Sequence, residues 1–405
     1  MKSMKTKEAL LLLIVLVALC AGCMKTEKVK ENEVKEIKIG TVWPLSGPLA
    51  SSGEKHLNGV KLRVDEVNNA GGIKSLGGAK VKLIVADNQG DPKVSASETE
   101  RLIVKEKIVG LVGCYTSSTT LPATEVTERY KIPTVACAGS PKITGRGYKY
   151  VFRAHSEVIK TADISVKFLK DVVKAKTVAI IMENSAYGQA SAKFCEKAAE
   201  DAGMEVVLKE LFPSGTKDLT PILLKVKEAK PDAILAVGYV SDAILMVKQM
   251  RELDVNVKAL IAPGGAGFND ADFLKAAKDD AEYIFVGIFW SPDAKWPGNA
   301  EFVAHYKEVF GEAPDPLAAE AYEATTVLLD AIERAGSTNP EKIREALAKT
   351  NMTWISGPIQ FDERGENIYK NVVVVQVQNG TFVTVYPEEV AVAKPIVPMP
   401  AWTER

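Results

Sequence analysis

A run of hydroxyl-bearing residues, Tyr115-Thr116-Ser117-Ser118-Thr119-Thr120, follows a short apolar segment and precedes a helical pattern. Hydroxyl groups and the free amides in the first turn of a helix donate hydrogen bonds, and the helix dipole adds positive partial charge there. This combination favours an anion, and a carboxylate is the natural ligand. Ser and Thr in this position also cap helices without any ligand, so capping is the alternative interpretation.

Other chemically useful residues follow predicted strands. Ligands of open α/β sheets bind beyond the carboxyl ends of the strands. The segments at these ends are rich in hydroxyls in the first half of the chain and in aromatic residues in the second half. They are residues 43–47, 114–120, 138–140, 183–188, 238–242 and 263–267.

Catalytic and metal-binding patterns are absent from the sequence. The three histidines, His56, His155 and His305, are far apart, and no GxSxG, GxxxxGK[ST] or HExxH pattern occurs. We therefore expect no enzyme, no metal site and no cofactor. Lys and Arg number 51 against 52 Asp and Glu, which argues against a nucleic-acid binder. Cys114 and Cys137 end strands that we expect to be neighbours, which makes a disulfide bridge between them an alternative. We expect two separate buried thiols.

The N-terminus predicts export. Lysines precede an apolar run from Ala9 to Cys20, which is shorter than the roughly 20 residues of a spanning helix and fits a secretory signal. Cys20-Ala21-Gly22-Cys23 resembles a lipobox, in which the second cysteine receives the lipid. We expect a signal peptide at 1–22 and a charged tether at 23–36. Cys23 would then anchor the protein to the outer face of the cytoplasmic membrane; a buried N-terminal helix is the alternative.

From Ile37 onward, apolar strands alternate with amphipathic helices in two successive sets. Strands that are apolar on both faces and separated by helices predict parallel sheets, so we expect an α/β fold with two doubly wound parallel-sheet lobes. Asn379-Gly380 predicts a hairpin turn near the end. The Pro-rich segment 391–405 is expected to be a surface strap or a loose tail.

Several segments resemble the branched-chain amino-acid binding proteins of ABC importers. They are IKIGTVWPLSGPLASSGEKHLNGVKLRVDEVNNAGGI, DNQGDPKVSASE, SPKITGRGYKYVFR, SAYGQASAKFCEKAAEDAGMEV and GPIQFDERGE, which together span about 37–386. The resemblance implies a type I periplasmic-binding-protein fold, in which two lobes joined by three crossovers close around one small ligand. Lobe 1 would comprise 37–152 plus 286–365, and lobe 2 would comprise 153–285 plus 366–390.

The resemblance also implies site residues. Ser117 matches the serine that binds the ligand carboxylate, Ser52 matches a position that touches the ligand side chain, and Tyr187 and Tyr239 match aromatic residues that close over it. Two positions depart from the family. A threonine is replaced by Gly139, beside Ser140, and the acid that receives the ligand ammonium is replaced by Gly264. Asp242 is a substitute for that acid, and the equally weighted alternative is that Asp242 only stabilises the N-terminus of its own helix. The full candidate set is Ser52, Tyr115, Ser117, Ala138, Gly139, Ser140, Tyr187, Tyr239, Asp242 and Gly264.

These observations predict a solute-binding protein, expected to be a monomer, that captures a small carboxylate and delivers it to an ABC permease. An amino acid of the branched-chain type is the expected ligand. A sensing module of the same fold for amides, urea-like or aromatic acid ligands is the alternative. A secreted enzyme is a third class, but it would need a nucleophile and a base, and all three histidines lie outside the strand ends.

Overall fold

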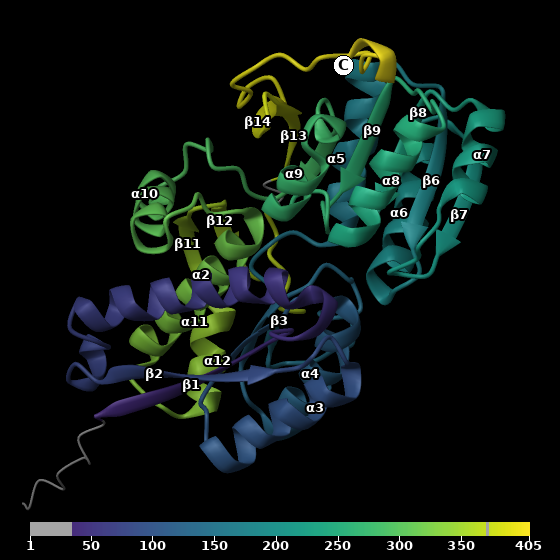
Figure 1. Ribbon diagram of the computed structural model, residues 1–405. Coiled ribbons are helices and arrows are strands. Elements are labelled where there is room, and N and C mark those ends of the chain that lie inside the picture. The colour runs from purple at the N-terminus through teal and green to yellow at the C-terminus, as the bar shows by residue number, and fades with distance from the viewer. Residues whose placement is uncertain (1–34, 370–371) are drawn as a thin grey trace, which may run out of the picture. The chain divides into compact units, whose positions relative to one another are not determined.

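Two β-sheets organise the chain, and each forms the centre of one lobe (Figure 1). The structure is a computed structural model that describes residues 35–369 and 372–405. The predicted signal peptide, the lipid-anchor position Cys23 and nearly all of the predicted tether lie outside these residues. Within the described residues, no helix has the length and apolar composition needed to span a membrane.

The first sheet is entirely parallel, as the alternation of strands and helices predicts. In spatial order its strands are β2 (Lys80–Asp87), β1 (Glu36–Trp43), β3 (Leu111–Cys114), β4 (Thr134–Cys137) and β5 (Val151–Phe152). The connecting helices are α2 (Ala50–Asn69), α3 (Pro92–Arg101) and α4 (Ser117–Tyr130). Asp91 caps α3 with its side chain, and Pro92 fills the first helical position. Cys114 and Cys137 are opposite each other in the register and remain separate buried thiols.

The second sheet contains parallel strands and an antiparallel edge. In spatial order its strands are β14 (Thr381–Tyr386), β13 (Val373–Gln378), β10 (Phe285–Ile288), β9 (Ala259–Pro263), β8 (Ala233–Val237), β6 (Thr177–Glu183) and β7 (Glu205–Phe212). Its helices are α5 (Val158–Phe168), α6 (Ala186–Asp201), α7 (Thr220–Ala229), α8 (Val240–Glu252) and α9 (Ala271–Ala277). The hairpin at Asn379-Gly380 is present, and both residues have positive φ as its turn requires.

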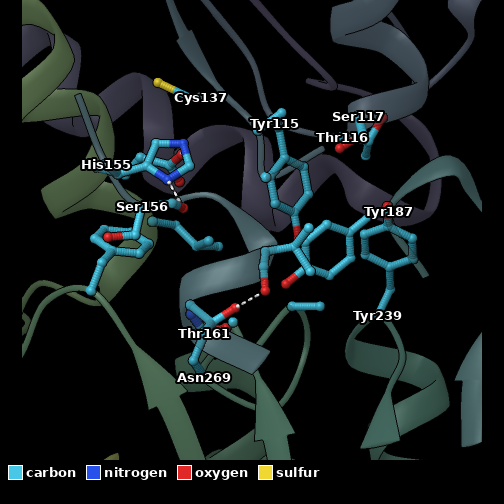
Figure 2. A pocket seen from close by; sticks show the side chains of 18 residues that line it. Tyr115, Thr116, Ser117, Cys137, His155, Ser156, Thr161, Tyr187, Tyr239 and Asn269 are labelled. Carbon is cyan, nitrogen blue, oxygen red and sulfur yellow. Dashed lines mark hydrogen bonds and ion pairs between the residues drawn. The ribbon is translucent and has the colours of Figure 1, made fainter. Parts of the chain in front are cut away.

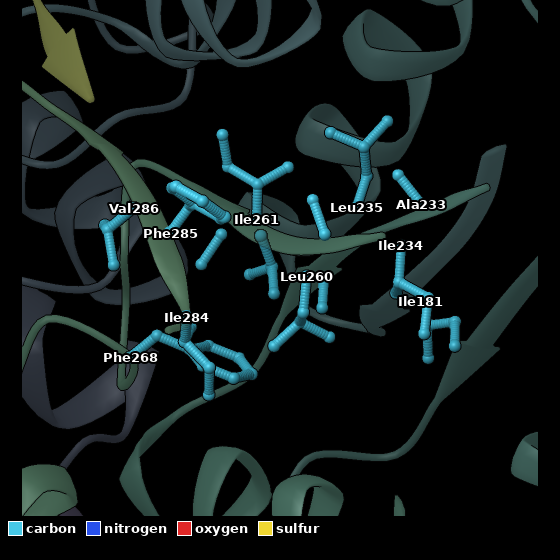
Figure 3. Close-up of a cluster of buried hydrophobic side chains, with 14 of the residues drawn as sticks. Ile181, Ala233, Ile234, Leu235, Leu260, Ile261, Phe268, Ile284, Phe285 and Val286 are labelled. Carbon is cyan, nitrogen blue, oxygen red and sulfur yellow. The ribbon is translucent and has the colours of Figure 1, made fainter. Parts of the chain in front are cut away.

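The core of the second lobe forms around the central strands of this sheet. Every residue of β8 and β9 is buried, because helices cover both faces of the sheet. Figure 3 shows Leu235, Ile261 and Phe285 projecting from neighbouring strands into this core. Continuous apolar strands are therefore the sequence feature that specifies this lobe.

The chain passes between the lobes three times, after β5, after β10 and after β12. Between the second and third passages it returns to lobe 1 as α10 (Asn299–Phe310), α11 (Pro316–Ala335), α12 (Pro340–Ala348) and the hairpin β11 (Asn351–Trp354)–β12 (Gly357–Gln360). Helix α11 packs closely on α2, and the absence of a side chain at Gly59 allows this. A Cβ there would lie only 2.2 Å from the carbonyl oxygen of Ala318. The predicted α/β fold with two lobes and three crossovers is confirmed.

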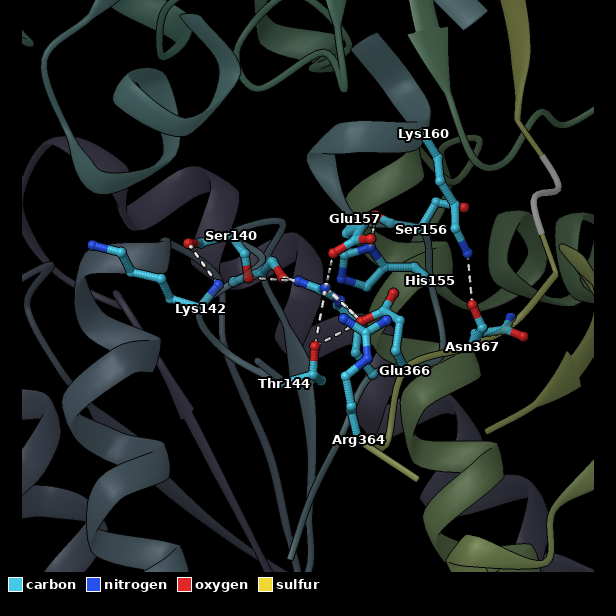
Figure 4. A network of polar contacts seen from close by, with 12 residues as sticks. Ser140, Lys142, Thr144, His155, Ser156, Glu157, Lys160, Arg364, Glu366 and Asn367 are labelled. Atoms are coloured by element: carbon cyan, nitrogen blue, oxygen red, sulfur yellow. Dashed lines mark hydrogen bonds and ion pairs between the residues drawn. The ribbon is translucent and has the colours of Figure 1, made fainter. Parts of the chain in front are cut away.

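A buried arginine joins two of these passages to a loop of lobe 1. Figure 4 labels Ser140, Thr144 and Glu366 of the polar network in which it takes part. Arg153 follows β5, and its Nη1 donates to the carbonyl oxygens of Ala138 and Ser140 at 2.8 and 2.9 Å. Its Nε donates to Oε2 of Glu366, in the third passage, at 3.0 Å. The loop after β4 is therefore held in place by residues of the first and third passages between the lobes.

Two boundaries differ from expectation. Strand β10 continues in the second sheet to Ile288, beyond the expected lobe boundary at 285/286. The C-terminal segment, expected to be a surface strap or a loose tail, contributes Met399 and Trp402 to the buried core of the second lobe. The indole Nε1 of Trp402 donates to the carbonyl oxygen of Val255 at 2.8 Å. Two apolar side chains near the end of a Pro-rich segment were the signal for this packing.

Candidate functional site

A cavity of about 60 Å³ lies between the lobes at the carboxyl ends of the strands. Most of the sequence-predicted site residues line it: Tyr115, Ser117, Ala138, Gly139, Tyr187, Tyr239 and Gly264. In Figure 2, Thr116 and Ser117 lie to the right of Tyr115, and His155 and Ser156 lie to its left. Residues from both lobes thus surround one enclosed space, which is the arrangement that a ligand-induced closure requires.

Ser117 combines the two features expected of an anion site. It is the first residue of α4, and the capping role belongs to its neighbour Thr116, whose Oγ1 accepts from the amide of Thr119 at 3.2 Å. Ser117 Oγ itself accepts a hydrogen bond from the amide of Ser140 at 3.1 Å. Accepting this bond uses a lone pair of Ser117 Oγ and leaves its one hydroxyl proton unused. The O–H of Ser117 can therefore donate to an anion. Thr116, which also lines the cavity, therefore does the capping and leaves Ser117 free of that role.

Tyr115 occupies an unusual backbone conformation next to this helix. Its φ is 84°, in the left-handed region that non-glycine residues rarely adopt. Its ring lies 4.7 Å from the ring of His56 in lobe 1 and 6.0 Å from the ring of Tyr239 in lobe 2. Strained conformations of this kind persist where the surroundings fix them, commonly at binding sites. The contact with Tyr239 makes the aromatic wall continuous across both lobes.

Tyr187 and Gly264 fit together in the second lobe. The hydroxyl of Tyr187 donates to the carbonyl oxygen of Pro263 at 3.1 Å. A Cβ at Gly264 would lie 2.0 Å from this hydroxyl oxygen. The phenol therefore fills the space into which a side chain at position 264 would project. Burial raises the pKa of Tyr187, so the phenol stays neutral.

Asp242 does not line the cavity, contrary to the role considered for it. Its carboxylate accepts from the amides of Gly215 at 2.8 Å and Tyr239 at 3.1 Å, and from the hydroxyl of Ser214 at 3.3 Å. It lies in the first turn of α8, where an acid is favoured by the helix dipole. We therefore assign Asp242 to capping of α8, the alternative for this residue, and not to binding the ammonium group of the ligand.

Ser52 and Ser140 also lie behind the cavity wall and not in it. The hydroxyl of Ser52 donates to Asp270 Oδ2 at 3.0 Å, across the lobes. Ser140 contributes its amide to Ser117 and its carbonyl oxygen to Arg153. Both residues support the site from the outside.

Two titratable residues of the cavity, Glu320 and His155, were not predicted from the sequence. Glu320 of α11 lines it together with His155 of the first passage, and Oε1 of Glu320 lies 2.7 Å from Nε2 of His155. Oε2 of Glu320 lies 3.5 Å from Nε2 of His56. Glu320 lies within a helix, and His155 follows the two-residue strand β5, which the sequence pattern does not predict, so neither residue was a candidate. Asn269, Thr161 and Phe289 are further lining residues without a recognised sequence signal.

Among the described residues, no group of three or more His, Cys, Asp or Glu side chains could hold a metal ion.

Comparison with known proteins gives a direct result: a family model described as periplasmic binding protein matches residues 36–381. The chain belongs to the periplasmic binding protein family. Membership implies a solute-binding role outside the cytoplasm.

Relatives with known names agree with this assignment. This periplasmic binding protein is 31% identical over 381 residues to Leu/Ile/Val-binding protein homolog 8 of Brucella suis biovar 1 (strain 1330), covering 89% of the chain and 92% of that protein. Among solved structures, the leucine-binding protein LivK of Thermotoga maritima matches at 29% identity with a TM-score of 0.79, covering 86% of this chain and 97% of that one.

The branched-chain amino-acid binding protein LivJ of Streptococcus pneumoniae, solved with isoleucine, matches at 27% identity with a TM-score of 0.79, covering 90% of this chain and 100% of that one. The resemblance noted from the sequence is thus confirmed for fold and family.

Proposed function

We propose that this periplasmic binding protein captures a small carboxylic acid, specifically an amino acid of the branched-chain type, and delivers it to an ABC permease. The observation that carries the carboxylate is the pairing of Ser117, with a free hydroxyl proton, and the first turn of α4 at the cavity. Val158, Phe289 and Leu317 supply an apolar wall suited to an aliphatic side chain. The family and its named relatives support the amino acid.

The test is a thermal-shift screen followed by calorimetry on the pure protein. A ligand that binds only the folded state raises the melting temperature. Leucine, isoleucine and valine should raise it at micromolar to millimolar concentration, whereas the corresponding amides, which lack the carboxylate, should not. A response to the amides alone would contradict the proposal.

A second candidate is the capture of an aromatic carboxylate, whether for transport or for sensing. The observation that favours it is the enclosure of the cavity by Tyr115, Tyr187 and Tyr239, since aromatic rings stack against one another. Benzoate and hydroxybenzoates belong in the same screen. A melting shift from these acids larger than that from leucine would favour this candidate over the first.

Anchoring to the membrane through Cys23 is part of the proposal and rests on the sequence alone. Mass spectrometry of the mature protein should find a lipid-modified Cys23 at its N-terminus. Cys23→Ala should release the protein from membranes while leaving its ligand affinity unchanged. An unmodified N-terminus at another residue would exclude the anchor.

A further inference from the structure

Glu320 is the one carboxylate among the lining residues of the cavity in the described part of the chain. It is buried, with 7% of its surface exposed, and it comes from α11 of lobe 1. The other acids near the strand ends are fully engaged elsewhere. Asp242 caps α8, and Glu183 accepts from the amides of Ser185 and Gly188 at 2.6 and 3.1 Å.

Two histidines pack against the carboxylate of Glu320. Nδ1 of His155 lies 2.9 Å from the carbonyl oxygen of Ser156, and Nδ1 of His56 lies 2.7 Å from that of Ser52. A carbonyl oxygen only accepts, so each Nδ1 donates a hydrogen. Nε2 of His155 lies 2.7 Å from Oε1 of Glu320, and Nε2 of His56 lies 3.5 Å from Oε2.

Burial by itself raises the pKa of Glu320, but the charge and hydrogen bond of His155, followed by the contacts of His56, outweigh burial and hold the pKa at about 2. Glu320 is therefore an ionised carboxylate on the cavity wall. Oε2, at 3.5 Å from His56, is the less engaged of its two oxygens.

A second acceptor faces the same cavity from the other lobe. Oδ1 of Asn269 is buried and has no hydrogen-bonding partner among the described residues. An unsatisfied buried acceptor destabilises the protein unless a ligand supplies a donor. The backbone carbonyls nearby are already used: that of Gly139 accepts from the amide of Val158, and that of Pro263 accepts from Tyr187.

Resting on the proposed function, we infer that Glu320 receives the α-ammonium group of the ligand and so selects amino acids over carboxylic acids that lack it. Asn269 Oδ1 supplies a further acceptor from lobe 2. The α-ammonium of an amino acid pairs with the ionised Glu320, whereas a plain carboxylate brings a further negative charge beside it into a buried space, which is costly. Glu320 thus does what an acid at position 264 would do, but from a helix of the other lobe.

The experiment titrates two ligands, leucine and its des-amino analogue 4-methylpentanoate, against wild type and Glu320→Gln by calorimetry. Wild type should prefer leucine. Glu320→Gln should weaken leucine by about tenfold to a hundredfold, as expected for the loss of a hydrogen bond to a charged group. The affinity for 4-methylpentanoate should stay within about threefold.

Glu323→Gln is the matched control, since Glu323 is a buried acid of the same helix that bonds to Ser356 and does not line the cavity. It should leave both affinities unchanged. Circular dichroism and melting curves establish folding of each variant. If Glu320→Gln does not fold, the double variant Glu320→Gln, His155→Gln replaces the ion pair by two amides, and the same change in preference is expected.

The outcomes separate the inference from the proposed function. Unchanged leucine binding in a folded Glu320→Gln protein, or an equal loss for both ligands, would overturn the role of Glu320 and leave amino-acid binding intact. A wild type that binds 4-methylpentanoate or benzoate but no amino acid would overturn both.

Discussion

Nζ of Lys55 lies 3.2 Å from Oδ2 of Asp272, so an ion pair joins helix α2 of the first lobe to helix α9 of the second. Lys55 also pairs with the buried Asp270, and Ser51 and Ser52 donate hydrogen bonds to Asp272 and Asp270. Burial by itself lowers the pKa of Lys55, but Asp315, Asp270 and Asp272 outweigh it, so the pKa is raised and the ammonium stays charged. These contacts join the two lobes in the closed arrangement.

Lys55→Met is expected to reduce the population of the closed state. Removing one partner of a buried, hydrogen-bonded charge pair costs about 2–5 kcal/mol, so ligand affinity should fall by about tenfold or more. Small-angle scattering should show a larger radius of gyration for the variant without ligand. Lys61→Met is the control, because Lys61 lies exposed on the same helix. Equal scattering and affinity in wild type and Lys55→Met would show that these contacts do not hold the lobes together.

Ser117→Ala is expected to weaken any carboxylate ligand by about 1–3 kcal/mol, the contribution of a hydrogen bond to a charged group. Ser118→Ala, which changes the neighbouring residue outside the cavity lining, should have little effect. Calorimetric titration of both variants measures the difference. If the two substitutions weaken binding equally, the anion does not lie at Ser117.

Glu323→Gln is expected to stabilise the protein more at pH 8 than at pH 5. Burial raises the pKa of Glu323 to about 7, despite the hydrogen bonds from Ser356. The folded protein therefore holds a proton that the unfolded chain releases above its ordinary pKa, and stability falls as the pH rises from about 4.5 to 7.

At 1.36 kcal/mol per pKa unit, the raised pKa of Glu323 lowers the free energy of unfolding by at most about 3 kcal/mol above pH 7. Glutamine has no such group to ionise, so the variant does not lose this stability. Melting temperatures of wild type and variant at the two pH values measure it. A difference between the proteins that does not change with pH would contradict the assignment.

Gly264→Ala is expected to disturb the site by displacing Tyr187. Gly264 and Gly215 have φ values of 75° and 74°, so alanine is strained at either position. A Cβ at Gly264 also meets the Tyr187 hydroxyl, whereas at Gly215 no atom lies within 4 Å. Both variants should lose stability by about 1–2 kcal/mol from the backbone, but only Gly264→Ala should also weaken ligand binding. Equal affinities would mean that Tyr187 does not contact the ligand.

The sequence predicts the site where strand ends create it, and it fails where helices do. Tyr115, Ser117 and Tyr239 directly follow apolar strands, and parallel strands bring their carboxyl ends together whatever the rest of the chain does. Glu320 lies in a helix that is buried nearly all round, so its helical pattern does not show that one turn faces a cavity. That depends on how α11 packs against α2, which is a property of the folded lobe.

The misassignment of Asp242 has a similar physical origin. An acid three residues after a tyrosine at a strand end can face a ligand or turn back to its own helix, and the sequence is the same in both cases. The amide of Gly215, from a distant loop, decides between them by occupying Oδ1 at 2.8 Å.

The insertion of Trp402 into the second core affects the order in which the protein can be completed during synthesis. Ribosomes make the chain from its N-terminus, so lobe 1 lacks α11 until residue 335 has been made, and lobe 2 lacks a core side chain until residue 402 has been made. Neither lobe can reach its final packing early in translation. A chain interrupted before residue 402 would therefore carry an opening in its second core.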